Sequence, residues 1–235
     1  METRGMLVHE GATRSIGTDL RLGCTLAAVA GAVNVAGFLA VGYYTANMTG
    51  NLSALAVGVG DGGMVSVLSC AGVLAAFVTG GCIAAVLVGM GRRHDLPAVH
   101  AASIALEGAL LIALGILSRV LPAWMEAGGL GYGLGFLMGL QNATVTHISG
   151  ARVRTTHMTG MLTDLGMELG QWLLDPGAAR VRERLRLHGA IIACFVLGGI
   201  MGAAGYRGCG VRVLVFMGLG LVALALPGLW RAMRR

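Results

Sequence analysis

Two short turns in this chain combine residue types that could bind a ligand. Both end in Met-Thr-Gly: one reads Thr45-Ala-Asn-Met-Thr-Gly50 and the other Thr155-Thr-His-Met-Thr-Gly160. A threonine hydroxyl is a good helix N-cap, and a glycine lets a ligand approach the backbone closely. A helix N-terminus exposes N–H donors with partial positive charge, which suits an anion or a carbonyl. The turns therefore predict either substrate contact or simply two well-capped helices. The candidate residues are Thr45, Thr49, Gly50, Thr155, Thr159 and Gly160.

Strongly polar amides lie in the apolar segment that precedes each turn, Asn34 in the first and Gln141 and Asn142 in the second. An unpaired amide in hydrocarbon costs several kcal/mol, so each of them needs a partner. That partner could be a bound substrate or a neighbouring helix. Since Asn34 and Asn142 occupy corresponding places before the two turns, we expect them to face one another.

Glu107 is the only ionisable residue of its apolar segment, Ala101-Ala-Ser-Ile-Ala-Leu-Glu-Gly-Ala-Leu-Leu111. An acid inside a membrane-spanning segment is by default a functional candidate. It could carry a proton that is coupled to transport. It could equally be a neutral acid that bonds a neighbouring helix.

Charged residues gather around the second turn. Arg152 and Arg154 precede it and could hold an anion by paired donors, or could simply be positive charge at the inner membrane surface. Asp164, Glu168 and Gln171 follow it at helical spacing, so they share one face of a helix. That face could bind a cation or the arginines, or be solvated.

The sequence carries no signature of catalysis, of a metal site or of a cofactor site. It contains no GxSxG, HExxH or phosphate-binding loop. The five cysteines form no CxxC pair, and His147 and His157 do not have a ligand spacing. We therefore expect a protein that is not an enzyme and that has no metal and no cofactor.

The composition places the elements that carry these residues in a membrane. The chain is 56% hydrophobic and only 12% charged, which is far from a typical soluble domain. Six apolar stretches approach the roughly 20 residues that a spanning helix needs. We predict an all-α bundle with spans near 22–43, 65–89, 98–118, 130–148, 188–206 and 211–230. The glycines inside them would let helices pack closely, within the chain or in a homodimer.

The two turns indicate an internal duplication. The offset is 108 residues between Asn34 and Asn142 and 110 residues between Thr49 and Thr159. We predict a polar N-terminus at 1–21, a first three-span repeat at 22–120 and a second at 121–235. Three spans per repeat is an odd number, so the repeats would have inverted topology, as in many transporters.

A short helix would follow each turn, at about 50–60 and 160–174. Both are too short to cross a bilayer. They could re-enter the membrane or lie at its surface, and the sequence leaves both arrangements open.

The charge distribution predicts the orientation. All 17 basic residues are arginines. With six spans, 14 of them would lie on the same side of the membrane as the N-terminus. This asymmetry predicts that both termini are cytoplasmic. The net charge of +6 then reflects contact with membrane lipid rather than nucleic-acid binding.

Four stretches together resemble the YoaK-like family of bacterial inner-membrane proteins of unknown function. They are Gly31-Ala-Val-Asn-Val-Ala-Gly-Phe-Leu39, Tyr44-Thr-Ala-Asn-Met-Thr-Gly-Asn51, Gly139-Leu-Gln-Asn-Ala-Thr144 and Thr155-Thr-His-Met-Thr-Gly-Met-Leu-Thr-Asp-Leu-Gly166. The resemblance extends over most of the chain from about residue 22. It implies a multi-span protein of the bacterial cytoplasmic membrane, and it brings no substrate, cofactor or catalytic residue.

By analogy of architecture, we expect a transporter or permease for an unknown small molecule, with a site near the midplane between the repeats. The alternatives are a scaffold or sensor that transports nothing, and a membrane-embedded enzyme.

Overall fold

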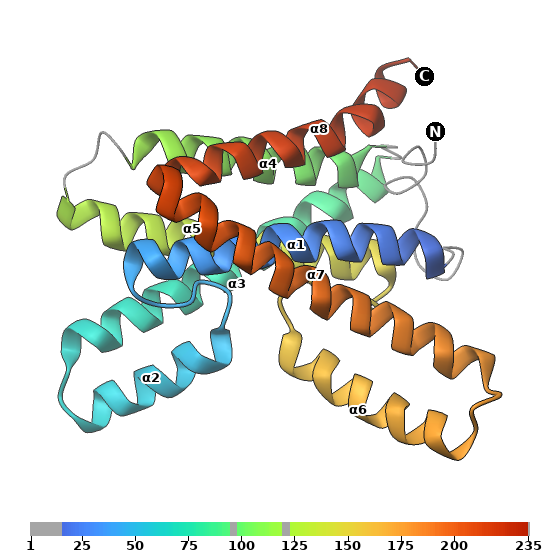
Figure 1. Ribbon diagram of the computed structural model, residues 1–235. Helices are drawn as coiled ribbons and strands as arrows, with labels where there is room; N and C mark the ends of the chain where they lie inside the picture. Colours follow the sequence, from blue (N-terminus) through green and yellow to red (C-terminus); the bar gives the residue numbers. More distant parts are fainter. Residues whose placement is uncertain (1–15, 95–97, 119–122, 235) are drawn as a thin grey trace.

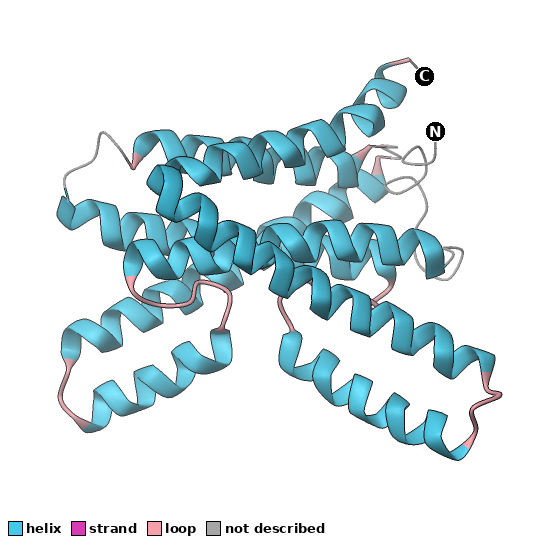
Figure 2. Ribbon diagram, in the orientation of Figure 1, coloured by secondary structure: helices cyan, strands magenta, loops and turns pink. Residues whose placement is uncertain are grey.

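The described part of the chain is entirely helical. The structure is a computed structural model that describes residues 16–94, 98–118 and 123–234, and no strand occurs among them (Figures 1 and 2). The helices are α1 (Ile16–Val41), α2 (Met48–Gly60), α3 (Met64–Arg93), α4 (Val99–Leu117), α5 (Ala123–Ser149), α6 (Met158–Leu174), α7 (Ala179–Cys209) and α8 (Val213–Met233), with a 3-10 turn, η3 (Gly210–Arg212), before the last.

Each predicted span falls on one of the six long helices, and the short helices α2 and α6 are also present. The boundaries differ most at α7, which begins at Ala179 and thus includes the arginine-rich segment 180–186. Arginine, leucine and glutamate are good helix formers, whereas hydropathy marks only the apolar part of a helix. For the same reason α1 begins at Ile16, inside the predicted N-terminal segment, of which 1–15 lies outside the described residues.

By length and hydropathy, four stretches of the described chain could cross a membrane, against the six predicted. They are Gly17–Val41, Met64–Gly91, Val99–Leu117 and Ala179–Met233. The last stretch is 55 residues long and contains two helices, α7 and α8, which separate at Gly210 with φ +63°. Helix α5 is absent from the four, because it is rich in glycine and carries Gln141, Asn142 and His147.

The long helices pack in three pairs, α1 with α7, α3 with α5, and α4 with α8. In the first pair a side chain at Gly31 would meet the carbonyl oxygen of Phe195, and one at Gly198 would meet that of Ala28. The helices therefore cross with their backbones in contact, which only glycine allows.

The second pair repeats this contact. A side chain at Gly139 on α5 would meet the carbonyl oxygen of Phe77 on α3, and one at Gly80 would meet that of Phe136. The glycines at these two crossings, Gly31, Gly80, Gly139 and Gly198, are thus occupied within the chain.

In the third pair, α4 with α8, the two glycines at the crossing contact each other reciprocally. A side chain at Gly108 on α4 would meet the carbonyl oxygen of Gly218 on α8, and a side chain at Gly218 would meet that of Gly108. Gly108 is also close to Val222, as Gly218 is to Ile112.

The short helices lie outside the three pairs. In Figure 1 α2 and α6 both begin near the centre of the molecule and diverge towards opposite ends. Each packs on the helix that follows it, α2 on α3 and α6 on α7. The chain thus leaves the end of α1 or α5, returns to the centre, and starts a short helix there.

Candidate functional site

The first turn is held against α1 by side-chain amides. The turn starts at Gly42, whose φ of +84° ends α1 with little strain because glycine has no Cβ. Asn34 Oδ1 on α1 then accepts a hydrogen bond from the Ala46 backbone N–H at 2.9 Å. Asn51 Nδ2 donates to the Tyr44 carbonyl at 3.1 Å. Asn34 therefore has a structural role, namely to fix the turn that leads into α2.

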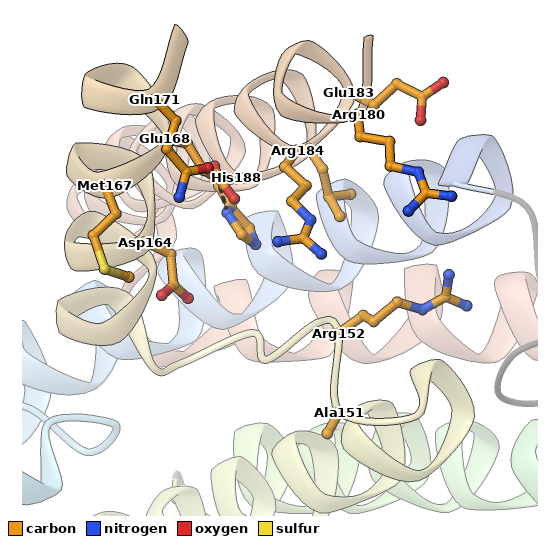
Figure 3. Close-up of a pocket in the computed structure, with 11 residues that line it drawn as sticks. Ala151, Arg152, Asp164, Met167, Glu168, Gln171, Arg180, Glu183, Arg184 and His188 are labelled. Atoms are coloured by element: carbon orange, nitrogen blue, oxygen red, sulfur yellow. Dashed lines mark hydrogen bonds and ion pairs between the residues drawn. The ribbon is translucent and has the colours of Figure 1, made fainter. Parts of the chain in front are cut away.

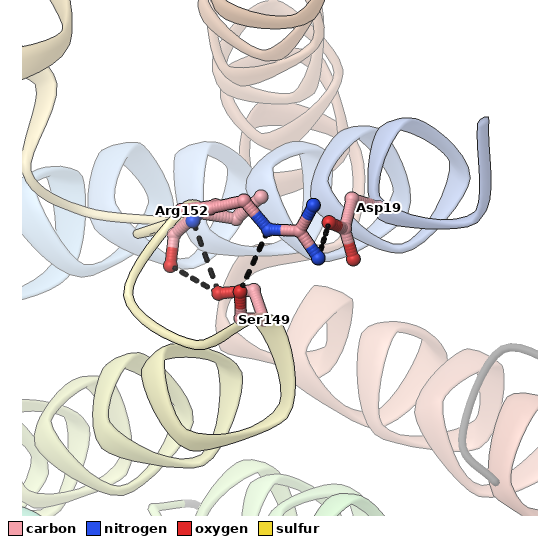
Figure 4. A network of polar contacts seen from close by, with 4 residues as sticks. Asp19, Ser149 and Arg152 are labelled. Carbon is pink, nitrogen blue, oxygen red and sulfur yellow. Dashed lines mark hydrogen bonds and ion pairs between the residues drawn. The ribbon is translucent and has the colours of Figure 1, made fainter. Parts of the chain in front are cut away.

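The second turn is held against α5 by different groups. Thr155 Oγ1 donates to Gln141 Oε1 at 3.0 Å, and the Ser149 side chain accepts from the Val153 N–H at 3.0 Å. Arg152 Nε donates to the Ser149 carbonyl at 3.1 Å, and its guanidinium pairs with Asp19 of α1 at 3.0 Å (Figure 4). The turn is thereby tied to both α5 and α1.

The predicted N-caps are wrong by two residues. Asn47 caps α2, where its Oδ1 accepts from the Gly50 N–H at 3.0 Å, and His157 occupies the N-cap position of α6 without a side-chain cap bond. Thr49 and Thr159 lie in the first helical turn with exposed side chains. For α2 the earlier start has a physical reason, because an asparagine is at least as good a cap as a threonine. No cap bond explains the earlier start of α6.

A steric reason explains why glycine occupies positions 50 and 160 in the two turns. The Asn47 amide occupies the space that a side chain at Gly50 would need, and the His157 ring occupies the corresponding space at Gly160. In both turns the residue before the helix therefore folds over the glycine three positions later.

A central cavity of about 240 Å³ lies where the two turns meet. Its lining comes from α1, from both turns and from α7: Asn34, Tyr44, Ala46, Asn47, Thr156, Met158, Thr159 and Phe195. No charged side chain lines it among the described residues. It offers amides and hydroxyls beside the N-termini of α2 and α6.

Of the predicted site residues, Asn34 and Thr159 line this central cavity, whereas Asn142 does not. Thr45 and Thr155 are fully buried beside it. Three polar atoms in this region have no hydrogen-bond partner among the described residues, namely Thr45 Oγ1, Gln141 Nε2 and Asn142 Oδ1.

Glu107 lies buried in α4 beside the Gln141 side chain of α5. Its Oε1 has no hydrogen-bond partner among the described residues. Because Gln141 also accepts from Thr155, these three side chains form a path from α4 to the second turn. Only the Gln141 side chain thus lies between Glu107 and the second turn.

Tyr43 precedes the cavity residue Tyr44 and contacts Gly131 of α5. Burial, and to a lesser extent the neighbouring Tyr132, raises the pKa of its phenol to about 12. The phenol therefore stays protonated near neutral pH.

A second and larger cavity, of about 520 Å³, lies between α6, α7 and the second turn (Figure 3). On its wall Glu168 Oε2 of α6 pairs with His188 Nδ1 of α7 at 3.0 Å. Asp164 and Gln171 also line it, so the three polar residues of α6 do share one face. A further cavity of about 350 Å³ adjoins it and shares Arg152 and Asp164 with it.

Sequence reasoning did not single out His188 or Asp19. Both lie at the edge of an apolar stretch, where a polar residue is ordinary, and their partners are distant in the chain. No three His, Cys, Asp or Glu side chains lie close enough to hold a metal ion in the described ranges, and the five cysteines are free.

Comparison with known proteins shows which family the chain belongs to. The model of a family described as "Protein of unknown function (DUF1275)" matches residues 22–226. The chain is 31% identical over 141 residues to the UPF0700 transmembrane protein YoaK of Bacillus subtilis (strain 168), which covers 60% of this chain and 62% of that relative. No solved structure matches.

Proposed function

The chain belongs to the DUF1275 family and is an integral membrane protein, and from this premise we propose that it is a small-molecule transporter or permease. Its substrate site is the central cavity between the two turns. Its two halves are inverted repeats, 22–120 and 121–235, which rock around that cavity to open it to either side of the membrane.

The observation that carries this proposal is that both turns line one cavity. Two helix N-termini, those of α2 and α6, begin beside it. N-termini of broken helices are the usual places where transporters bind anionic groups of a substrate. The uncharged lining and the volume of about 240 Å³ favour a small solute with carbonyl or carboxylate oxygens.

The inverted repeat is supported by the helix directions. In Figure 1 α1 runs opposite to its counterpart α5, and α4 runs opposite to its counterpart α8. The crossing of α1 with α7 has the same glycine–carbonyl contacts as the crossing of α5 with α3. Six long helices then cross the membrane, and α2 and α6 re-enter it from opposite faces.

The orientation follows from the arginines. Arg180, Arg182, Arg184 and Arg186 occupy the first two turns of α7, at the end where α6 also ends. We place this end at the cytoplasmic face of a bacterial cytoplasmic membrane, with both chain termini on the same side.

Glu107 is our candidate for proton coupling. A proton on Glu107 would change what Gln141 can bond, and Gln141 accepts from Thr155 at the second turn. A Glu107→Gln variant should therefore bind substrate and lose only the dependence of uptake on a proton gradient.

Accessibility from the two faces tests the transporter proposal without knowledge of the substrate. Asn47→Cys and Thr159→Cys are placed singly in a protein whose five native cysteines are replaced, and are labelled with a membrane-impermeant thiol reagent in vesicles of both orientations. We expect both positions to be labelled from either face.

The matched controls are Asp61→Cys, at the outer end of α2, and Leu174→Cys, at the inner end of α6 and 89% exposed. Each should react from one face only. If Asn47→Cys and Thr159→Cys also react from one face only, or not at all, the protein does not alternate. It is then better described as a scaffold or sensor.

A further inference from the structure

The larger cavity between α6 and α7 has an uneven charge distribution. Arg152, Arg180 and Arg184 gather at one side of the gap, and Asp164 and Glu168 lie on the α6 side opposite them (Figure 3). Arg180 and Arg184 are four residues apart on α7 and so share the face that lines the cavity. The cavity therefore has a basic end and an acidic end.

The polar pairs within the structure show which of these side chains already have a partner. Arg152 pairs with Asp19 at 3.0 Å, and Glu168 pairs with His188 at 3.0 Å. For Arg180, Arg184 and Asp164 the described residues show no such partner within 4.0 Å. Glu183 lines the rim but points away from the gap in Figure 3.

We propose that this cavity binds a zwitterionic headgroup, with a phosphate at Arg180 and Arg184 and a primary ammonium at Asp164. Guanidinium groups bind phosphate oxygens through paired N–H donors. A primary ammonium can donate hydrogen bonds to a carboxylate, which a quaternary one cannot. The acidic end also disfavours a polyanion, which the arginines alone would attract.

The same chemistry could come from a phospholipid or from a soluble aminoalkyl phosphate. The surroundings of the cavity accept a lipid, because α6 exposes Leu169, Leu173 and Leu174 along its outer side. Met167, which is 56% exposed, connects that apolar surface to the cavity. A bound phosphoethanolamine lipid would thus place its headgroup in the cavity and its chains along α6.

This site is separate from the central cavity and does not depend on transport. In the corresponding hairpin of the first half, α2 packs closely on α3 where Gly58 meets Val67. The polar cavity described above is lined by α6, α7 and the residues before the second turn.

The test measures binding by purified protein in detergent, as the rise in unfolding temperature at graded ligand concentrations. The probes are phosphatidylethanolamine, phosphatidylcholine and phosphatidylglycerol with identical chains, and O-phosphoethanolamine as the soluble arm. We expect phosphatidylethanolamine to bind most tightly. Loss of two charge-assisted contacts in Arg180→Ala/Arg184→Ala should weaken it about tenfold or more.

The control is Arg182→Ala/Arg186→Ala, which removes two exposed arginines of the same helix segment that do not line the cavity. It should leave binding within about twofold, as expected of screened surface charges. Asp164→Asn should abolish the preference for phosphatidylethanolamine over phosphatidylcholine while phosphate binding persists.

Equal binding of the three lipids by the wild-type protein would overturn the proposal, and so would equal losses in the two double variants. If O-phosphoethanolamine competes with the lipid, the site accepts a soluble phosphate. If the lipid is preferred and the soluble compound does not compete, the ligand is the membrane lipid. Both of these results support the zwitterion site and identify its source.

Discussion

The two hairpins that follow the repeated turns are built differently. In the first, α2–α3, Gly58 packs against Val67, and Asn47 caps the helix. In the second, α6–α7, a carboxylate–imidazole pair lines a cavity of about 520 Å³, and His157 makes no cap bond. The first hairpin is therefore closely packed at Gly58, whereas the second carries a hydrogen-bonded polar pair beside an open cavity.

The turns differ in the same way. Asn34 binds the Ala46 N–H, whereas its counterpart Asn142 has an unpaired Oδ1 among the described residues. Thr155 binds Gln141, whereas its counterpart Thr45 has an unpaired Oγ1. The two copies of the motif thus form different hydrogen bonds, so similarity of sequence does not carry individual contacts from one turn to the other.

The glycine crossings are what the halves share, and breaking them should have the largest effect. Gly31→Ala and Gly139→Ala each place a methyl group against a backbone carbonyl, of Phe195 and Phe77 respectively. We expect each to cost about 3 kcal/mol or more of unfolding free energy, the upper end for overpacking. Denaturation in mixed micelles measures the loss of unfolding free energy. Gly166→Ala is the control, because a methyl group at Gly166 would enter open space. A loss of stability from only one of the two variants would show that the two crossings are not equivalent.

The pair of Glu168 and His188 in the second hairpin gives the next largest effect. His188→Leu leaves the buried Glu168 without its partner, which should cost about 2 kcal/mol. Glu168→Leu/His188→Leu should recover most of that loss, because an apolar pair makes the second hairpin resemble the first. The same denaturation assay compares the two, and a double variant as unstable as the single one would contradict this view of the hairpins.

Substitution of the corresponding asparagines Asn34 and Asn142 should change stability by unequal amounts. Asn34→Ala leaves the Ala46 N–H buried without an acceptor, at a cost of about 1.5 kcal/mol. Asn142→Ala removes an Oδ1 that has no partner, so we expect a change within about 0.5 kcal/mol. Thermal unfolding of both variants side by side would settle it, and equal losses would mean that the two turns are held alike.

The two buried threonines, Thr45 and Thr155, should show the smallest difference in stability loss. Here the larger loss is expected in the second turn, whereas for the asparagines it is expected in the first. Thr155→Val removes the bond to Gln141 and should cost about 1 kcal/mol. Thr45→Val replaces an unpaired hydroxyl by a methyl group and should be neutral or slightly stabilising. A destabilising Thr45→Val would indicate that the Thr45 hydroxyl has a partner, such as water in the central cavity.

The helical class, the long helices and the two short ones could be predicted because hydropathy and helix propensity are local properties of the chain. The shared face of Asp164, Glu168 and Gln171 also follows from their spacing alone, and all three line the cavity between α6 and α7. The helix starts could not be predicted, since Asn47 and Thr49 are both acceptable caps and the path of the loop decides between them.

The pairs Asp19–Arg152 and Glu168–His188 were beyond prediction for a different reason. Each joins helices or turns that are brought together only by tertiary packing. The cavity between the turns has the same origin, because Thr156 and Asn47 meet only once α1 and α7 have crossed.

The reciprocal contact of Gly108 with Gly218 has a consequence for the ancestry of the fold. In an isologous interface of a homodimer, a residue meets its own copy across a two-fold axis. Gly108 and Gly218 are separated by 110 residues, the same offset as the two Met-Thr-Gly turns, and Ile112 and Val222 exchange places around them in the same way. A half-length chain inserted into the membrane in both orientations would reproduce this contact between two identical glycines. The crossing of α4 and α8 thus has the form of an isologous interface within one chain, which is the form that fusion of two identical half-length genes would give it.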